Sequence, residues 1–274
     1  MYKSTMKAFK DCYGMWALVA GAAEGIGESF TEALAKKRMN LVMVDINSVA
    51  MRTLAQKIRN QYHVDIKEIT LDLSEKDVWV NCMKAIGELD CRLLVYVPAY
   101  SHVKPFYENS GEELDHYIDL NTRTPIQLIR AFTDQIKTGR PGGIILMSSL
   151  AGIKGPKYSA PYAATKAFSI MLSEGLFHEF RENGIDIMTC CAGMTDTSTF
   201  WSSKPEIRSK WPGVLDPEKV VSYALKKLGK KAVSIPGWKN RLSYFFLTRL
   251  LSRTFAIRLI AKSMEKIYPD RSSG

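Results

Sequence analysis

Seven short apolar segments recur along the chain, and longer stretches with the periodicity of amphipathic helices separate them. The segments span residues 16–20, 41–45, 66–71, 93–97, 144–147, 185–191 and 232–235. Nearly continuous apolarity indicates strands that are buried on both faces, and the intervening helices would supply the crossovers that parallel strands need. The pattern therefore predicts a doubly wound α/β fold, in which a parallel sheet carries helices on both faces.

A single domain accounts for all 274 residues, because no repeat and no Gly/Ser/Pro-rich linker interrupts the pattern. We place its core at residues 13–237 and a basic helical tail at residues 238–274. The sequence Asp216-Pro217-Glu218 is typical of a helix that begins near residue 217.

The five cysteines show neither the spacing of a disulfide framework nor that of a metal site, so we expect reduced thiols and no bound metal. This composition favours a cytoplasmic protein. The first apolar run is too short for a secretion signal, and no run of 18 apolar residues predicts a membrane span.

A glycine-rich turn follows the first expected strand and precedes a helical stretch. It contains Gly21, Glu24, Gly25, Ile26 and Gly27. Glycines allow the backbone to turn sharply and approach a pyrophosphate, while a helix N-terminus offers free N–H groups and a positive dipole end. This context predicts a dinucleotide site, although a simple tight turn would show the same glycines.

Carboxylates end the next two expected strands. Asp45 lies 18 residues after Gly27, where it can accept hydrogen bonds from both hydroxyls of the adenosine ribose and would repel a 2′-phosphate. We therefore predict NAD as the cofactor, with Arg52 leaving room for NADP. Asp72, with the adjacent Leu73, is a candidate for the adenine edge, and a turn-forming aspartate is an equal alternative.

A Tyr-x-x-x-Lys spacing places a phenol and an ammonium on one helix face. The spacing occurs three times, at Tyr100 and Lys104, at Tyr162 and Lys166, and at Tyr223 and Lys227. Only Tyr162 has a serine 13 residues upstream, and this Ser149 ends an apolar strand. The sequence therefore favours Ser149, Tyr162 and Lys166 as a catalytic group.

These motifs together resemble the short-chain dehydrogenase/reductase family over residues 13–237. The matching residues, in family order, are Gly21, Gly25, Gly27, Asn121, Ser149, Tyr162 and Lys166. The resemblance implies a Rossmann-like seven-stranded parallel sheet, an NAD(P)-dependent oxidoreductase acting on CH–OH groups, and a homo-oligomer, either dimer or tetramer. It also implies that Thr195 and Thr197 lie near the carboxamide and pyrophosphate of the cofactor.

The resemblance implies a role for each polar residue. Tyr162 would exchange a proton with the substrate oxygen, and Lys166 would lower the pKa of this phenol and hold the nicotinamide ribose. Ser149 would polarise the substrate carbonyl, and Asn121 would hold a water molecule for proton relay.

The turn at residues 96–99 departs from the family pattern. It reads Tyr-Val-Pro-Ala where the family has Asn-Asn-Ala-Gly, and proline offers no N–H, so the usual hydrogen bonds must be replaced. Together with Tyr13, Gly14 and Trp16, Tyr96 and Val97 are similar to bacterial hydroxysteroid dehydrogenases of the bile-acid 7β type.

We expect substrate selection in residues 200–211 and in the turn near residue 102. The candidate side chains are Phe200, Trp201, Lys204, Arg208, Lys210, Trp211, His102 and Phe106. Aromatic walls with cations at the rim suit a large apolar molecule that bears an anionic group. Solvated charges on a lid are the alternative explanation.

Positive charge concentrates at the end of the chain. Residues 226–274 hold 12 of the 38 Lys and Arg but only 2 of the 28 Asp and Glu. In this tail Phe246, Leu250, Ile257 and Met264 are candidates for an apolar side. Such a segment can lie on anionic lipid, cover the substrate mouth or pack against a partner subunit. Nucleic acid is not expected, because no reading module accompanies the charge.

The leading hypothesis is an oxidoreductase that transfers a hydride between NAD(H) and a secondary alcohol or ketone of a steroid- or lipid-like substrate. A membrane-surface 3-oxoacyl or 3-hydroxyacyl reductase is a second hypothesis. A dinucleotide-binding regulator without turnover is a third, because the departure at residues 96–99 affects cofactor fit.

Overall fold

The computed structural model describes residues 9–136, 140–207 and 213–269. Within them, seven parallel strands form one sheet in the order β3-β2-β1-β4-β5-β6-β7. The strands are β1 (Trp16–Ala20), β2 (Asn40–Asp45), β3 (Ile66–Thr70), β4 (Cys91–Tyr96), β5 (Gly142–Ser149), β6 (Ile185–Ala192) and β7 (Val233–Ser234). All seven expected strands are present, and the doubly wound α/β prediction is confirmed.

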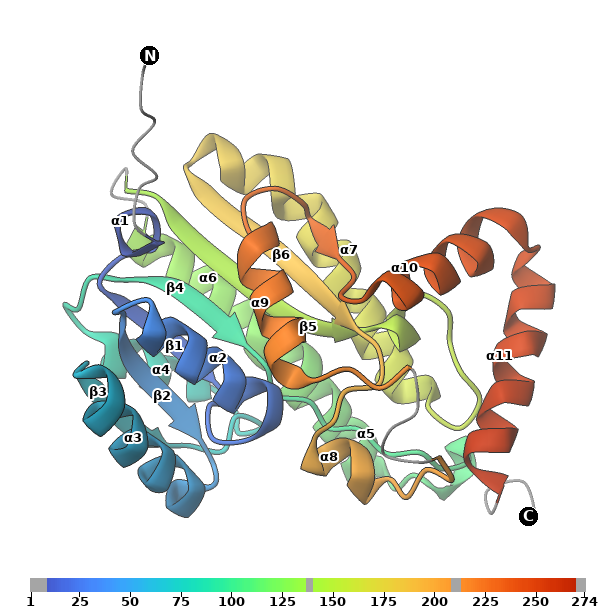
Figure 1. The fold of residues 1–274 in the computed structure, drawn as a ribbon. Coiled ribbons are helices and arrows are strands. Elements are labelled where there is room, and N and C mark those ends of the chain that lie inside the picture. The colour runs from blue at the N-terminus through green and yellow to red at the C-terminus, as the bar shows by residue number, and fades with distance from the viewer. Residues whose placement is uncertain (1–8, 137–139, 208–212, 270–274) are drawn as a thin grey trace.

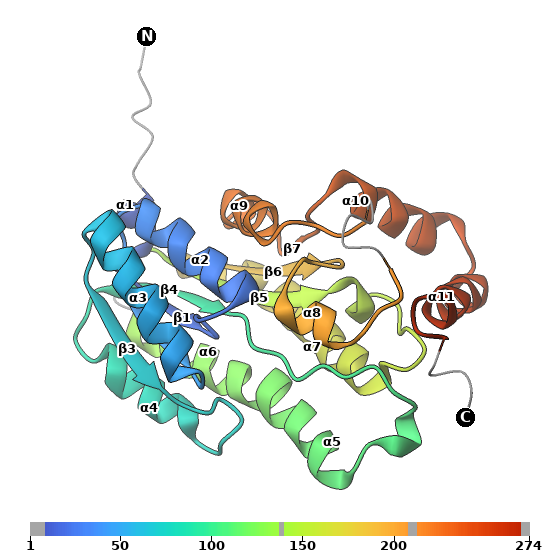
Figure 2. The same ribbon diagram turned by 60° about the horizontal axis from the view of Figure 1, so that its bottom comes forward.

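Helices cover both faces of the sheet (Figures 1 and 2). They are α1 (Phe9–Tyr13), α2 (Gly25–Lys36), α3 (Ser48–Tyr62), α4 (Val78–Ile86), α5 (Gly111–Ile118), α6 (Thr124–Ile136), α7 (Ala160–Glu182), α8 (Ser198–Ser202), α9 (Pro217–Lys227), α10 (Trp238–Phe245) and α11 (Arg253–Ile267). Short 3-10 turns lie at η1 (Phe106–Glu108) and η3 (Leu150–Gly152), and π-helical turns at η2 (Asp119–Arg123) and η4 (Phe246–Leu250).

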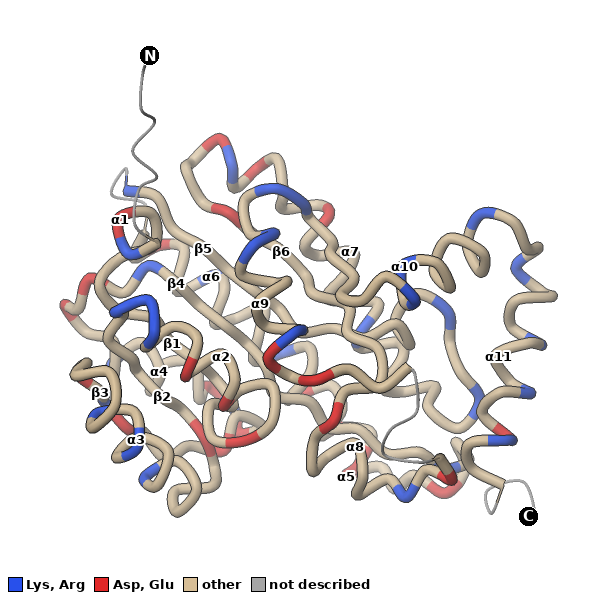
Figure 3. Tube along the Cα trace, in the orientation of Figure 1, with Lys and Arg blue, Asp and Glu red and all other residues tan. Residues whose placement is uncertain are grey.

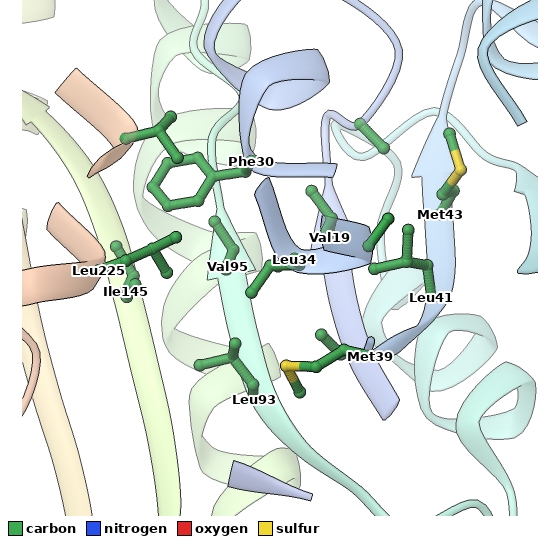
Figure 4. Close-up of a cluster of buried hydrophobic side chains, with 14 of the residues drawn as sticks. Val19, Phe30, Leu34, Met39, Leu41, Met43, Leu93, Val95, Ile145 and Leu225 are labelled. Atoms are coloured by element: carbon green, nitrogen blue, oxygen red, sulfur yellow. The ribbon is translucent and has the colours of Figure 1, made fainter. Parts of the chain in front are cut away.

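Alternate residues of the central strands enter two separate hydrophobic cores. In β1, Val19 packs with α2, α3 and α9, whereas Leu18 packs with α4, α6 and α7 on the opposite face. Figure 4 shows the first core, where Val19 lies among Phe30, Leu34 and Val95. Burial on both faces explains why these strands are apolar at every position.

Two local expectations can be compared directly with the structure. Helix α9 begins at Pro217, and the Asp216 side chain accepts a hydrogen bond from the Glu218 N–H, as the sequence predicts. Strand β3 lies at the sheet edge and contains no fully buried residue, so two-sided burial holds only for strands inside the sheet.

The end of the described chain forms a helical arm. Helix α10, the turn η4 and helix α11 project from the sheet beyond β7 and then turn back towards α8 (Figures 1 and 2). Within the described ranges, no helix is both long and apolar enough to pass through a bilayer.

Candidate active site

A cavity of about 790 Å³ opens at the carboxyl ends of the strands. Residues that follow β1, β2, β3, β4, β5 and β6 all contribute to its wall. The order of the sheet reverses between β1 and β4, and the crevice at such a reversal is where doubly wound sheets bind ligands. One end of the cavity is the glycine turn, and α11 lies at the other.

The glycine turn is tightly packed at each of its three predicted positions. Gly21 has φ +71°, and a Cβ there would lie 2.8 Å from Pro98 Cγ. A Cβ on Gly27 would lie 1.6 Å from the Gly21 oxygen, so only glycine lets α2 begin this close to β1. A Cβ on Gly25 would lie 3.0 Å from Thr197 Cγ2. This close packing keeps the turn compact and leaves the backbone of Gly21 and Gly25 at the cavity, where a pyrophosphate can approach it.

The first N–H groups of α2 point to an anion site. Glu24, the N-cap of α2, makes no side-chain cap, and within the described residues no oxygen accepts from the N–H groups of Gly25 or Ile26. Free N–H groups at a helix N-terminus bind phosphate oxygens. The Glu24 carboxylate instead accepts from Asn47 Nδ2 at 2.7 Å and from Ser198 Oγ at 3.3 Å, which ties the turn to α3 and α8.

Asp45 lines the cavity at the end of β2. Its carboxylate accepts from the Ala23 N–H and from the Asn47 N–H, each at 2.9 Å. A carboxylate has about four lone-pair sites, so both oxygens keep room for a hydroxyl donor. The carboxylate therefore holds the glycine turn in shape and still presents acceptors to the cavity.

Asp72 and Leu73 also line the cavity, as expected. Asp72 Oδ1 accepts from the Ser74 N–H at 2.8 Å and from Ser74 Oγ at 2.6 Å. This is the turn-forming role that the sequence left as the alternative, and Oδ2 remains available to an adenine.

The three predicted catalytic side chains meet in the middle of the cavity. Ser149 ends β5, and Tyr162 and Lys166 lie one turn apart on α7. The Ser149 hydroxyl lies near enough to the Tyr162 phenol to lower the pKa of that phenol. Lys166 is only 4% exposed, and its Nζ donates to the Met147 oxygen at 2.8 Å and lies 5.7 Å from the centre of the Tyr162 ring.

Close packing fixes α7 against the end of β5. A Cβ on Gly152 would lie 2.6 Å from the Lys166 carbonyl carbon, and Ser148 Oγ donates to the Lys166 oxygen at 2.8 Å. These contacts hold the backbone of the lysine, so the position of its ammonium does not depend on a flexible stem alone.

The pKa of Tyr162 differs from the expectation. Removal from water raises the pKa of Tyr162 to about 12, and the nearby Ser149 hydroxyl opposes this rise. Burial lowers the pKa of Lys166 to about 8. The expected lowering of the phenol pKa by Lys166 is therefore wrong for this structure, because desolvation of the phenol outweighs its neighbours.

Asn121 lies behind the site and does not line the cavity. It is 2% exposed within the π-helical turn η2. Its Oδ1 accepts from the Tyr100 N–H at 2.8 Å, and its Nδ2 donates to the Tyr100 oxygen at 2.9 Å and to Thr165 Oγ1 at 3.0 Å. The side chain therefore joins the turn after β4 to α7. Its role in holding a water molecule stays a prediction.

Packing replaces the hydrogen bonds expected at residues 96–99. Pro98 lies against Gly21, and the Val97 N–H donates to the Ala20 oxygen at 3.1 Å. The Tyr96 hydroxyl donates to the Leu120 oxygen at 2.7 Å from a buried position. The departure from the family pattern thus keeps the turn closed against the glycines.

Thr195 and Thr197 line the cavity after β6. Thr197 Oγ1 accepts from the Phe200 N–H and thereby caps α8, and its methyl group is the one that faces Gly25. Every predicted cofactor residue except Gly27, which lies beneath the turn, borders the cavity.

The far end of the cavity is walled by α8 and α11. Phe200 and Ser203 of the α8 region face Met264, Ile267 and Tyr268. Ser203 Oγ lies 2.9 Å from the Tyr268 hydroxyl, and the Glu206 N–H donates to the Ile267 oxygen at 2.8 Å. Next to this wall, Lys157 of the loop before α7 pairs with Glu265 of α11 at 2.6 Å. The carboxyl end of the tail therefore walls one end of the cavity, while contact with anionic lipid, a cover over the substrate and packing against a partner subunit all stay predictions.

Some substrate candidates are placed differently or are not described. His102 is hydrogen-bonded through its backbone to the Tyr117 hydroxyl, and Phe106 is 61% exposed. Trp201 donates from Nε1 to Asp196 at 2.6 Å. Arg208, Lys210 and Trp211 lie outside the described residues. His116, which lines the cavity from α5, carried no motif in the sequence and was not predicted.

The two other Tyr-x-x-x-Lys pairs have no catalytic geometry. Tyr100 and Lys104 both bond Glu113, at 3.3 and 2.7 Å. Tyr223 and Lys227 share a face of α9, where Nζ lies 5.5 Å from the ring centre, and neither residue borders the cavity. Of the three pairs, the one with a serine 13 residues upstream is the one that lines the cavity, and its catalytic role stays a prediction.

A parallel sheet with a glycine turn at its switch point, together with a Ser–Tyr–Lys group in the same cavity, defines a nicotinamide-dinucleotide oxidoreductase. The chain belongs to the short-chain dehydrogenase family, whose family model matches residues 15–208. Its oxidoreductase class and its action on CH–OH groups follow from this membership.

Individual relatives are moderately similar to the chain. It is 30% identical over 233 residues to a 7beta-hydroxysteroid dehydrogenase of Clostridium sardiniense, which covers 85% of this chain and 89% of that protein. It is 28% identical over 251 residues to a very-long-chain 3-oxoacyl-CoA reductase of Phaeosphaeria nodorum, covering 87% and 72%. A solved 7beta-hydroxysteroid dehydrogenase superposes with a TM-score of 0.87 at 28% identity, over 93% of this chain and 99% of that one.

A further solved relative was determined with a cofactor. The short-chain dehydrogenase from Sphingobium yanoikuyae, in complex with NADPH, superposes with a TM-score of 0.75 at 25% identity and covers 85% of this chain and 91% of that one. The dinucleotide class is therefore shared, and the choice between NAD and NADP is not decided by similarity.

Proposed function

We propose that this protein is an NAD-dependent oxidoreductase for a secondary alcohol or ketone carried on a steroid- or lipid-like substrate. The observation that carries the proposal is a single cavity with Ser149, Tyr162 and Lys166 at its centre and an apolar wall of Phe200, Met264 and Ile267 at its far end. A wall of this kind suits a large apolar molecule whose one polar group reaches the phenol.

The polar residues divide the work of moving a proton. The nicotinamide, when bound, supplies or accepts the hydride. With a pKa raised to about 12, Tyr162 keeps its proton at neutral pH and can donate it to the oxygen of a ketone. Ser149 orients that oxygen, and Lys166, with a pKa lowered to about 8, lies close enough to stabilise the phenolate that remains.

Asp45 supports NAD over NADP, because its free lone pairs face the cavity and its negative charge would repel a 2′-phosphate. We expect the variant Asp45→Ala to lower the ratio of kcat/KM with NAD to kcat/KM with NADP by about tenfold. Steady-state kinetics with both cofactors measures this ratio. Asp65→Ala removes a carboxylate near β3 that borders no part of the cavity and serves as the control. If Asp45→Ala leaves this ratio unchanged, Asp45 does not contact the adenosine ribose.

A 3-oxoacyl or 3-hydroxyacyl thioester is the second candidate substrate. The similarity to a very-long-chain 3-oxoacyl-CoA reductase and the basic residues of the tail favour it, since a thioester of this type carries phosphates on a long apolar chain. A non-catalytic regulator is disfavoured, because the turn at residues 96–99 closes on the glycines without disturbing the catalytic group.

We further propose a homo-oligomer in the cytoplasm. The five cysteines are unpaired and four of them are buried, which suits a reducing compartment.

A substrate screen tests the proposal. Purified protein is mixed with NADH or NAD and with hydroxysteroids, bile acids, 3-oxoacyl thioesters and small alcohols, and NADH absorbance is followed. We expect turnover with at least one steroid or acyl substrate and little with small alcohols. Turnover confined to small alcohols would contradict the proposed substrate class. The absence of turnover with every class of substrate would contradict the proposal that the protein is an enzyme.

A further inference from the structure

Large apolar side chains are concentrated on the surface of the arm formed by residues 238–269. The arm carries eight of them in exposed positions, although it is a short part of the chain: Trp238, Leu242, Phe245, Phe246, Leu250, Phe255, Ile257 and Leu259. Trp238 is 64% exposed and Phe255 is 54% exposed. Exposed apolar surface on this scale marks a contact site.

The same arm is strongly basic. Its seven Lys and Arg are Lys239, Arg241, Arg249, Arg253, Arg258, Lys262 and Lys266, and all are exposed. In the described part of the chain, none of them has an ion-pair partner. The one acidic residue of the arm, Glu265, is engaged by Lys157. Figure 3 shows Lys and Arg along α10 and α11, with acidic residues only at the carboxyl end of α11.

Helical spacing places the apolar and basic side chains together. Phe255, Leu259 and Lys262 follow one another at i, i+4 and i+7 on α11, and all are exposed. Met264 and Ile267 occupy the other side of the same helix and wall the cavity. On α10, Trp238, Leu242 and Phe245 repeat the i, i+4 and i+7 spacing.

We propose that this arm docks on the surface of an anionic lipid bilayer. Helices that lie in a membrane interface combine exposed aromatic and leucine side chains with a basic rim, because the rings enter the headgroup region while Lys and Arg meet lipid phosphates. Neither helix of the arm, as described over residues 238–269, is long and apolar enough to cross the bilayer, so the proposed contact is peripheral.

Charge opposes the arm of a second copy of this chain as the partner of this surface. A symmetric dimer through the arm would bring seven cations of one copy against seven of the other, with no free acidic residue on either arm. Like charges placed opposite each other oppose association, whereas a bilayer with anionic lipid supplies the missing negative charge.

Docking also places the cavity beside the membrane. Helix α11 contacts the bilayer with one face and walls the substrate end with the other, so an apolar substrate dissolved in the membrane would have a short path to Tyr162. This last step rests on the proposed function, whereas docking itself does not depend on any enzymatic activity.

Vesicle flotation tests the docking. The full-length protein is mixed with vesicles of phosphatidylcholine alone or of phosphatidylcholine with phosphatidylglycerol, and the bound fraction is measured at low and high salt. We expect binding to the anionic vesicles and a decrease at high salt, because salt screens the attraction. Folding of each variant is checked by circular dichroism, and flotation requires no turnover.

Matched variants separate the arm from the general basicity of the protein. The charge variant is Arg249→Glu with Arg253→Glu and Arg258→Glu, and its control is Lys226→Glu with Lys230→Glu and Lys231→Glu. Both variants reverse three positive charges at exposed positions, so they change the net charge of the protein by the same amount. We expect the arm variant to lower the vesicle partition coefficient by about a hundredfold and the control by less than about tenfold.

Apolar variants test insertion. Phe245→Ser with Phe255→Ser is compared with Val49→Ser and Met171→Ser, which are exposed elsewhere. We expect the arm pair to lose at least about tenfold in partition coefficient and the control pair to bind as wild type does. Three results would overturn the proposal: no flotation of folded wild type, equal losses in arm and control variants, or a fall in oligomer mass in the arm pair with no change in flotation.

Discussion

The two ends of the cavity are built in different ways. At the nucleotide end, strand termini and glycines are in direct contact, and a side-chain atom added at Gly21 or Gly27 would collide with backbone or with Pro98. At the substrate end, α11 rests on α8 and on the loop before α7 through a few polar contacts, and its outer face is exposed. One end of the cavity is therefore shaped by backbone geometry and the other by contacts between side chains.

The largest expected effect concerns proton transfer at the centre of the cavity, between its two ends. Tyr162→Phe removes the proton donor and leaves the ring beside Lys166, so we expect kcat to fall by about a thousandfold. The dissociation constant for NADH, measured by fluorescence titration, should change by less than about threefold. Activity within tenfold of wild type would show that another group supplies the proton.

A pH experiment tests how strongly the centre of the site is desolvated. The pKa of Lys166 is lowered from 10.5 to about 8, so between these values the folded state binds fewer protons than the unfolded state. Stability should therefore rise with pH across this window, by up to about 3 kcal/mol relative to Lys166→Met, which lacks the titrating group.

Urea unfolding at several pH values between 7.5 and 10.5 measures this difference. The exposed Lys219 on α9 provides a control, since Lys219→Met should show the same pH dependence as wild type. A wild-type curve parallel to that of Lys166→Met would mean that the lysine is solvated.

The nucleotide end should resist even a single methyl group. Gly21→Ala places a Cβ at φ +71° and 2.8 Å from Pro98 Cγ, and we expect it to lower the free energy of unfolding by about 2 kcal/mol and to weaken NADH binding. Gly111→Ala, where the Cβ would meet open space, should change stability by less than about 1 kcal/mol. If the two variants lose the same free energy of unfolding, the turn at Gly21 is not rigid.

The substrate end should tolerate change. Tyr268→Phe removes the hydroxyl that lies 2.9 Å from Ser203 Oγ. We expect substrate binding to weaken by about 1 kcal/mol, which would be measured as a severalfold rise in KM with kcat retained. In a double-mutant cycle with Ser203→Ala the two effects should not add. Additive effects would mean that the two hydroxyls act separately.

The sheet could be predicted in nearly every strand because burial on both faces leaves an unbroken apolar run in the sequence. The range 16–20 coincides with β1, whereas the range 232–235 shortens to the two residues of β7, since only part of that run pairs with β6. The meeting of Ser149, Tyr162 and Lys166 in one cavity could be predicted because the three residues follow one another in a fixed order along β5 and α7.

The rest depends on contacts between distant segments. Nothing in the sequence distinguishes Met264, which walls the cavity, from Ile257, which lies on the same side of α11 and is 42% exposed. Their environments differ because the carboxyl end of α11 is hydrogen-bonded to Glu206, while its amino end projects away from the sheet. The pKa of Tyr162 could not be predicted for a similar reason, since desolvation is a property of the assembled cavity.

Tyr268 lies in the wall of the cavity, close to the end of the described chain. An affinity tag or fluorescent fusion attached downstream would therefore follow a residue that lines the cavity. The amino end of the described chain, at α1, lies far from α11, so handles for purification or surface immobilisation belong there (Figures 1 and 2).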